Sequence, residues 1–109
     1  MEIGNIIYLY TLDLLPVLAV RQCLIPERFC KVTCIKPVKG GTDEERYLEY
    51  TATSLLGEEV YTFNNYLSPY QYCNIETLEK EIDLIKSELL SENYTEMKKI
   101  INDIKELIQ

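Results

Sequence analysis

The chain has 109 residues, of which 47% are hydrophobic, and its formal net charge is −7. A chain of this length and composition is expected to fold as one domain with a modest core, which excludes a disordered protein. Because an acidic chain repels phosphate, we expect no direct contact with nucleic acid. A more natural partner is a protein with a basic surface, for example a nucleic-acid-binding protein.

The charge is unevenly distributed along the chain. Residues 1–39 contain five basic and three acidic side chains, residues 40–73 contain one and six, and residues 74–109 contain five and nine. The three segments therefore carry net charges of +2, −5 and −4. The middle segment has the densest negative charge, although acidity of this kind can also serve only to keep a small protein soluble.

The N-terminal region has no basic stretch of the kind that begins a signal peptide, and Pro16 interrupts its apolar residues. No apolar run approaches the ~20 residues that a membrane-spanning helix needs. These features favour a cytoplasmic protein without a membrane partner.

The first 73 residues have the patterns of β-strands. Alternating or continuous apolar runs bounded by turn residues predict strands over 3–10, 17–24, 29–36, 46–54 and 60–63. In the third of these strands Cys30, Val32 and Cys34 share one face. Residues 37–45 and 64–72 are predicted to be loops, and the two long strands on either side of the first loop should form a hairpin.

The last 36 residues have the pattern of two helices. Asn74 is suited to cap a helix that runs to about Leu90, and Asn93 with Glu96 resembles a capping box that begins a second helix. Apolar residues at steps of three and four give each helix one apolar stripe. These stripes consist of Ile75, Leu78, Ile82, Ile85 and Leu89, and of Met97, Ile100, Ile101, Ile104, Leu107 and Ile108. The helices are expected to pack on the sheet as an αα-hairpin or to pair with another chain.

Strands and helices are expected to share one core. Its predicted members are Ile6, Tyr8, Val32, Leu48, Tyr50, Val60, Leu78, Ile82 and Ile85.

The four cysteines Cys23, Cys30, Cys34 and Cys73 lack the spacing of a zinc site. Four strand residues span ~13 Å, so Cys30 and Cys34 are too far apart to share one ion or one disulfide if their segment is a strand. We expect small buried side chains in a reducing compartment, with a metal site or a redox role as alternatives. No metal and no other cofactor is predicted.

No catalytic motif is present. The absence of histidine leaves a cysteine nucleophile without its usual base. The acidic pairs Glu44/Glu45 and Glu58/Glu59 lie in predicted turns, where carboxylates are solvated, and Gly40-Gly41 lacks the lysine of a phosphate-binding loop. The sequence therefore predicts that the protein is not an enzyme.

Residues 61–72 hold five aromatic side chains, and the chain has nine tyrosines in all. Tyrosine is favoured at interfaces because it offers a large, rather rigid contact area with a polar end. The same side chains would also suit the sealed end of a barrel. We predict a partner-binding surface that combines acidic residues with exposed tyrosines, namely Asp43, Glu44, Glu45, Glu58, Glu59, Tyr61, Tyr66, Tyr70 and Tyr72.

The segment Ile3-Gly4-Asn5-Ile6-Ile7-Tyr8 resembles the first strand of small SH3-like barrels, although Asn5 replaces the usual aspartate. The later order of hairpin, short strand and terminal helices is similar to that of many small phage-encoded proteins. The expected fold is α+β: a small antiparallel sheet or SH3-like barrel in residues 1–73, followed by a helical hairpin in residues 74–109, within one domain of residues 1–109.

Two functions of different classes follow. The first is a non-enzymatic inhibitor or adaptor that uses its acidic, tyrosine-rich surface to occlude a basic partner. It would resemble the small acidic anti-CRISPR proteins, which act in the host cytoplasm. The second is a structural module that forms homo-oligomers through its C-terminal amphipathic helices. A β-barrel that binds nucleic acid is a third reading, which the charge disfavours.

Overall fold

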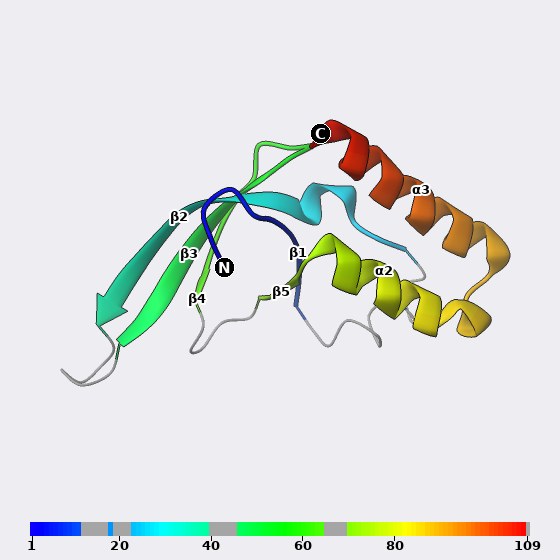
Figure 1. Ribbon diagram of the computed structural model, residues 1–109, viewed down its shortest axis with the longest axis horizontal. Helices are drawn as coiled ribbons and strands as arrows, with labels where there is room; N and C mark the ends of the chain where they lie inside the picture. Colours follow the sequence, from blue (N-terminus) through cyan, green and yellow to red (C-terminus); the bar gives the residue numbers. More distant parts are fainter. Residues whose placement is uncertain (12–17, 19–22, 40–45, 65–69, 109) are drawn as a thin grey trace.

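The chain forms an antiparallel sheet that is followed by two helices, as its computed structural model shows (Figure 1). The structure describes residues 1–11, 18, 23–39, 46–64 and 70–108. The strands are β1 (Ile6–Tyr10), β2 (Phe29–Lys39), β3 (Arg46–Ser54), β4 (Val60–Asn64) and β5 (Gln71–Cys73). The helices are α2 (Ile75–Leu84) and α3 (Ser91–Leu107), with 3₁₀ turns η1 (Pro26–Arg28) and η2 (Lys86–Glu88). The predicted α+β class is confirmed.

The five strands follow the order β4-β3-β2-β1-β5, and every neighbouring pair is antiparallel. Of the two predicted alternatives, the open antiparallel sheet is confirmed and the SH3-like barrel is excluded: within the described strands, no backbone pairing joins β4 to β5. The two edge strands instead approach each other through side chains, with the rings of Phe63 and Tyr72 5.6 Å apart.

Several strand boundaries differ from the sequence prediction, and β1 begins at Ile6 instead of residue 3. β5 occupies the end of the predicted loop 64–72, and it forms because Tyr8 and Tyr10 of β1 pair with Cys73 and Gln71. A pairing between residues so far apart in the chain leaves no local pattern. β2 continues to Lys39 through Pro37, where a loop is predicted. Of the predicted strand 17–24, only Leu18, Cys23 and Leu24 are described, and none of the three lies in a strand.

A β-bulge in β2 changes which side chains face the core. Val32 pairs with Ala52 and Cys34 pairs with Thr51, so Thr33 is an extra residue on this strand. Its hydroxyl donates a hydrogen bond to the Thr51 carbonyl at 3.2 Å. An extra residue reverses the alternation of side chains beyond it. The prediction that Cys34 shares a face with Cys30 and Val32 is therefore wrong, and Cys34 is exposed.

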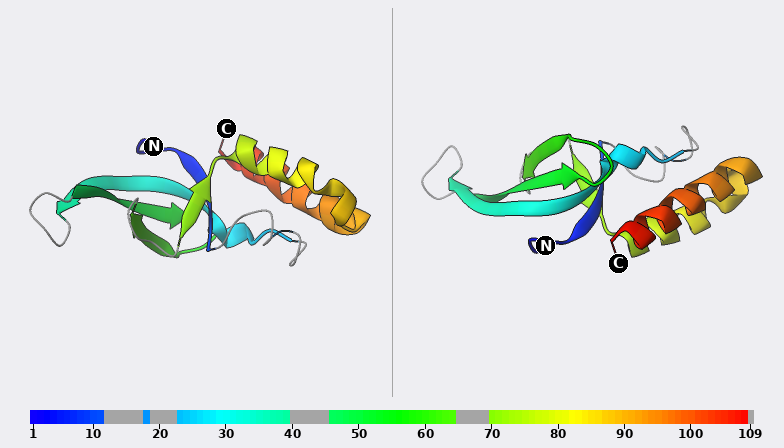
Figure 2. Two further views of the ribbon diagram at one scale, coloured as in Figure 1. Left: turned by 90° about the horizontal axis from the view of Figure 1, so that it is seen from below. Right: turned by 90° about the horizontal axis from the view of Figure 1, so that it is seen from above.

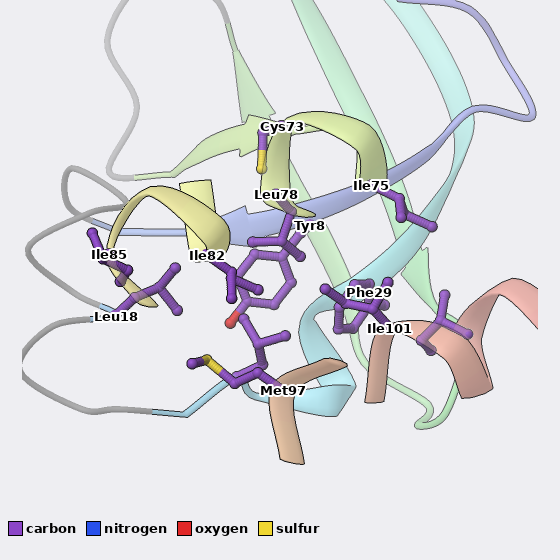
Figure 3. Packing of buried hydrophobic residues seen from close by; sticks show 12 residues of the cluster. Tyr8, Leu18, Phe29, Cys73, Ile75, Leu78, Ile82, Ile85, Met97 and Ile101 are labelled. Carbon is purple, nitrogen blue, oxygen red and sulfur yellow. The ribbon is translucent and has the colours of Figure 1, made fainter. Parts of the chain in front are cut away.

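The sheet has two cores rather than the single predicted core, because both of its faces are covered. A helix-side core joins the sheet to α2 and α3 (Figure 3). It contains Tyr8, Leu18, Leu24, Phe29, Cys73, Ile75, Leu78, Ile82, Ile85, Met97, Ile101 and Ile104. A sheet-side core lies within the curl of the sheet and contains Ile7, Leu9, Cys30, Val32, Tyr50, Ala52 and Phe63. Adjacent residues of β1 therefore belong to different cores.

Two predicted core residues are exposed. Val60 is 61% exposed because Tyr61 and Phe63 of the same strand face the curl, which turns Val60 outward. Leu48 is 38% exposed. The pairing between β3 and β4 covers Glu49 to Thr53, so Leu48 lies in the part of the β2–β3 hairpin that β4 does not reach. Ile6 is only partly buried.

The helix capping prediction is confirmed for α2 and wrong for α3. The Asn74 side chain accepts a hydrogen bond from the Thr77 N–H at 2.8 Å. α2 ends at Leu84, earlier than expected, and α3 begins at Ser91, so Asn93 lies inside the helix. The extended backbone of Leu89 and Leu90 makes the turn between the helices. Met97, Ile101 and Ile104 of α3 face the core.

The molecule is elongated, with principal extents of 51, 28 and 20 Å. The far end of the β2–β3 hairpin points away from the pair of helices (Figure 1). Over the described residues, no helix is long and apolar enough to cross a membrane.

Ile82 provides a test of the helix-side core, because its side chain is fully buried in the last turn of α2. Ile82→Ala is expected to lower the free energy of unfolding by about 2–5 kcal/mol, the usual cost of removing a buried aliphatic side chain. Leu84→Ala is the matched control, because Leu84 lies on the same helix but is 72% exposed. Chemical denaturation of both variants measures the difference. Equal losses would show that α2 does not dock through Ile82.

Candidate functional site

Five of the nine predicted site residues lie in the described part of the chain. Glu58 and Glu59 are exposed in the turn between β3 and β4. Tyr61 lies on β4, Tyr70 immediately precedes β5, and Tyr72 lies within β5. The other four are Asp43, Glu44, Glu45 and Tyr66, which lie outside the described residues.

The three tyrosines gather where the sheet stays open between β4 and β5. The rings of Tyr61 and Tyr70 meet edge to face at 5.7 Å. The Tyr72 ring contacts those of Tyr50 at 6.1 Å and Phe63 at 5.6 Å. Such aromatic pairs each contribute ~0.5–1.5 kcal/mol beyond the area that they bury. They hold the two edges of the sheet together in the absence of backbone pairing.

The tyrosines are only partly withdrawn from solvent. Tyr61 and Tyr70 are half-buried, and Tyr72 remains 40% exposed. Burial raises the pKa of the Tyr61 and Tyr72 hydroxyls, and a hydrogen bond with Tyr50 raises that of Tyr72 further. With its pKa raised, the Tyr61 hydroxyl remains neutral at physiological pH and keeps its proton as a hydrogen-bond donor.

Arg28 is a member of this site that the sequence analysis missed. Its guanidinium carbon lies 4.9 Å from the ring centre of Tyr61 and 5.4 Å from that of Tyr70. One of its nitrogens, Nη1, is buried without a hydrogen-bond partner. No local signal marks Arg28, because η1 is separated from the tyrosines by more than thirty residues of chain. The predicted site has no basic residue, whereas the folded site has one.

The acidic turn lies beside this aromatic cluster. The Ser54 N–H donates to the Glu59 carbonyl at 2.9 Å, and the Gly57 N–H donates to the Ser54 hydroxyl at 3.1 Å, which fixes the turn. The Glu59 carboxylate is close enough to Tyr61 to raise the pKa of its hydroxyl. Glu58 and Glu59 follow the Ser54 end of β3, whereas the predicted acidic residues 43–45 precede its Arg46 end. A strand of nine residues thus separates the two acidic groups in the chain.

Two of the four cysteines are buried, and two are exposed, contrary to the expectation of four buried side chains. Burial raises the pKa of the Cys30 thiol to about 11 and that of the Cys73 thiol to about 12. Cys23 and Cys34 are exposed, and all four are free thiols. Among the described side chains, no three cysteines or carboxylates are grouped in a way that could hold a metal ion.

A groove of about 570 Å³ borders the same region, between β1, β5 and the first turn of α2. Tyr10, Tyr72 and Thr77 are among its lining residues. Its volume lies in the range of small-ligand sites, ~300–1,000 Å³. The Asn74 side chain at its wall is engaged in capping α2.

The described residues define an α+β protein with an open, curled antiparallel sheet and a C-terminal helical pair. Comparison of the chain with protein-family models, with curated proteins and with solved structures gave no match.

The thiols provide a test of this part of the structure. At pH 8, iodoacetamide is expected to modify Cys23 and Cys34 quickly and to leave Cys30 and Cys73 unmodified, because only an accessible thiolate reacts. Mass spectrometry of tryptic peptides identifies the modified positions. Unfolding in guanidinium should make all four thiols reactive. Protection of Cys34 together with Cys30 in the folded protein would contradict the bulge at Thr33.

Proposed function

We propose that this chain is a non-enzymatic protein-binding inhibitor or adaptor. Its binding surface lies at the open side of the sheet and contains Glu58, Glu59, Tyr61, Tyr70 and Tyr72. The observation that supports this proposal most strongly is the gathering of three tyrosines from two edge strands next to two exposed carboxylates. The predicted residues Asp43, Glu44, Glu45 and Tyr66 belong to the same proposal.

The two kinds of side chain have different roles in binding. Exposed carboxylates attract a basic partner over a distance and speed its association, but they contribute little to the final affinity. Tyrosines that lose their remaining contact with water on binding provide the larger share of the affinity. Tyr72, with 40% of its surface still exposed, has the most to lose and is the expected anchor.

A partner of this kind is a protein with a basic face, such as a nucleic-acid-binding protein. By covering that face, the acidic surface would exclude nucleic acid from it. This mode of action is the one implied by the resemblance to small phage-encoded inhibitors. The raised pKa values of Cys30 and Cys73 support a packing role for these thiols rather than a nucleophilic one.

The alternative function, assembly through the C-terminal helices, has less support. Most of both apolar stripes is buried in the helix-side core of the same chain, including Ile82 and Ile101. The opposite surface is occupied by polar contacts within the pair, where Lys98 bridges Glu79 at 3.5 Å and Asp83 at 3.6 Å. A second copy would have to use the exposed residues Leu84, Leu90, Leu107 and Ile108.

Charge reversal tests the proposed surface. The wild-type protein, a Glu58→Lys/Glu59→Lys variant and a Glu88→Lys/Glu92→Lys variant are each used to capture proteins from an extract of the source cell. The second variant is the matched control, because it makes the same change of charge at exposed positions on the helical pair. A basic protein is expected to bind the wild type and the control but to be lost from the first variant, because the two introduced lysines repel the basic face of the partner.

The captured protein, once purified, allows the two roles to be separated. Reversal of Glu58 and Glu59 should slow association and reduce its dependence on salt, whereas Tyr72→Ala should speed dissociation. Both rates are measured by surface plasmon resonance. Unchanged binding of both variants would show that the working surface lies elsewhere on the chain.

A further inference from the structure

The backbone of β4 has an edge that is open to a further strand. The Ser54 N–H bonds to the Glu59 carbonyl, and the register then makes Ala52–Tyr61 and Tyr50–Phe63 the hydrogen-bonded pairs of β3 and β4. The backbone groups of Val60 and Thr62 therefore point away from β3. Within the described strands, no strand pairs with this side of β4. Two N–H and two C=O groups thus line an edge.

The same alternation of hydrogen-bonded and non-hydrogen-bonded pairs identifies the backbone groups that point outward on the other open edges of the sheet. On the part of β2 beyond its pairing with β1, Ile35 and Pro37 point away from β3. Pro37 therefore occupies a position where an N–H would otherwise face outward, and the charged Lys36 is its neighbour. Proline and lysine are the residues by which proteins protect such edges. On β5, which has three residues, only the backbone of Tyr72 points outward.

β4 lacks every one of these protections. Its sequence Val60-Tyr61-Thr62-Phe63-Asn64 contains no charge and no proline, and its two outward-pointing residues Val60 and Thr62 are exposed. The sheet curls, so that β4 lies along one side of its opening (Figure 2). An unprotected edge of β-prone residues is the kind to which another protein adds a strand.

The charge around β4 favours one occupant. Glu58 and Glu59 are exposed immediately before Val60, so a strand laid along β4 would have two carboxylates at one end. A second copy of this chain would bring a net charge of −7 against an equal charge. A basic segment would instead be attracted.

We propose that β4 binds an extended, lysine- or arginine-rich segment of a partner protein as an added sixth strand, paired through the backbone of Val60 and Thr62. This inference rests on the proposed function, because it specifies how the basic partner engages the surface around Glu58 and Glu59. The tyrosines of the opening then flank the added strand, and its charge meets the acidic turn.

A defined peptide provides the first test. A fluorescently labelled hexapeptide of alternating lysine and valine is titrated with the protein, and its anisotropy is measured. The lysine–valine peptide is expected to bind. Two control peptides should bind at least about tenfold more weakly. An alternating glutamate–valine peptide lacks the positive charge, and a lysine–valine peptide methylated at every internal peptide nitrogen lacks the backbone N–H donors. Failure of the lysine–valine peptide to bind, or equal binding of either control peptide, overturns the proposal.

A matched pair of variants provides the second test. Thr62→Pro removes the outward-pointing N–H without removing a bond to β3, and the chain already contains Pro37 at an equivalent position of β2. Thr62→Ala keeps the N–H and is the control. The proline variant should bind the lysine–valine peptide at least about tenfold more weakly, and the alanine variant should stay within about twofold of the wild type. Equal binding by the proline variant overturns the proposal.

Hydrogen exchange of the unmodified protein keeps the proposal testable if Thr62→Pro does not fold. The peptide should slow exchange at the amides of Val60 and Thr62 and leave that of Tyr61, which already bonds to β3, unchanged. Absence of this slowing overturns the proposal. The proposal is also overturned if exchange at the amides of Val60 and Thr62 slows without peptide as the protein concentration rises and a dimer forms. The strand paired with β4 would then belong to a second copy of the chain.

The Thr62→Pro variant also separates this inference from the proposed function when it is used in the capture experiment. If it retains a partner that Glu58→Lys/Glu59→Lys loses, the proposed function stands and strand addition falls. If the charge-reversed variant retains the partner as well, the proposed function falls.

Discussion

Strand β1 is buried on both faces, and the rest of the fold depends on this constraint. Tyr8 faces the helices, where it stacks on Phe29 at 4.8 Å and accepts a hydrogen bond from the Ile25 N–H at 3.1 Å. Ile7 and Leu9 face the curl of the sheet. A strand in such a position must be apolar along its whole length, as Ile6-Ile7-Tyr8-Leu9-Tyr10 is. The helices cover one side, and the sheet must bend round to cover the other.

The bending of the sheet creates the candidate site. The described strands do not close over the sheet-side core through backbone pairing, because β4 and β5 are not paired and β5 has only three residues. Aromatic rings fill the remaining gap from both edges, and Arg28 is enclosed among them. The same incomplete closure leaves β4 with an open edge. The tyrosines therefore have a structural role and a proposed binding role at once, which is why Tyr72 is both packed against Phe63 and partly exposed.

Much of the local structure could be predicted from the sequence, because it depends on neighbouring residues. Alternation along residues 46–54 identified β3, and the stripe of Leu78 and Ile82 identified the buried face of α2. Asn74 caps the helix that follows it, as its position predicted. The capping box predicted at Asn93 was wrong, because α3 begins at Ser91 and Asn93 lies inside the helix.

The sequence by itself determined the α+β class, the succession of a β-rich part and two helices, and the concentration of acid and tyrosine before the helices, since each is a property of neighbouring residues or of composition. Only the tertiary structure decided the rest. The extra residue Thr33 shifts the register of β2 and turns Cys34 outward, β5 exists through its pairing with β1, and Arg28 meets Tyr61 and Tyr70 across the curl. These features depend on contacts between segments that lie far apart in the chain, and no local pattern records such contacts.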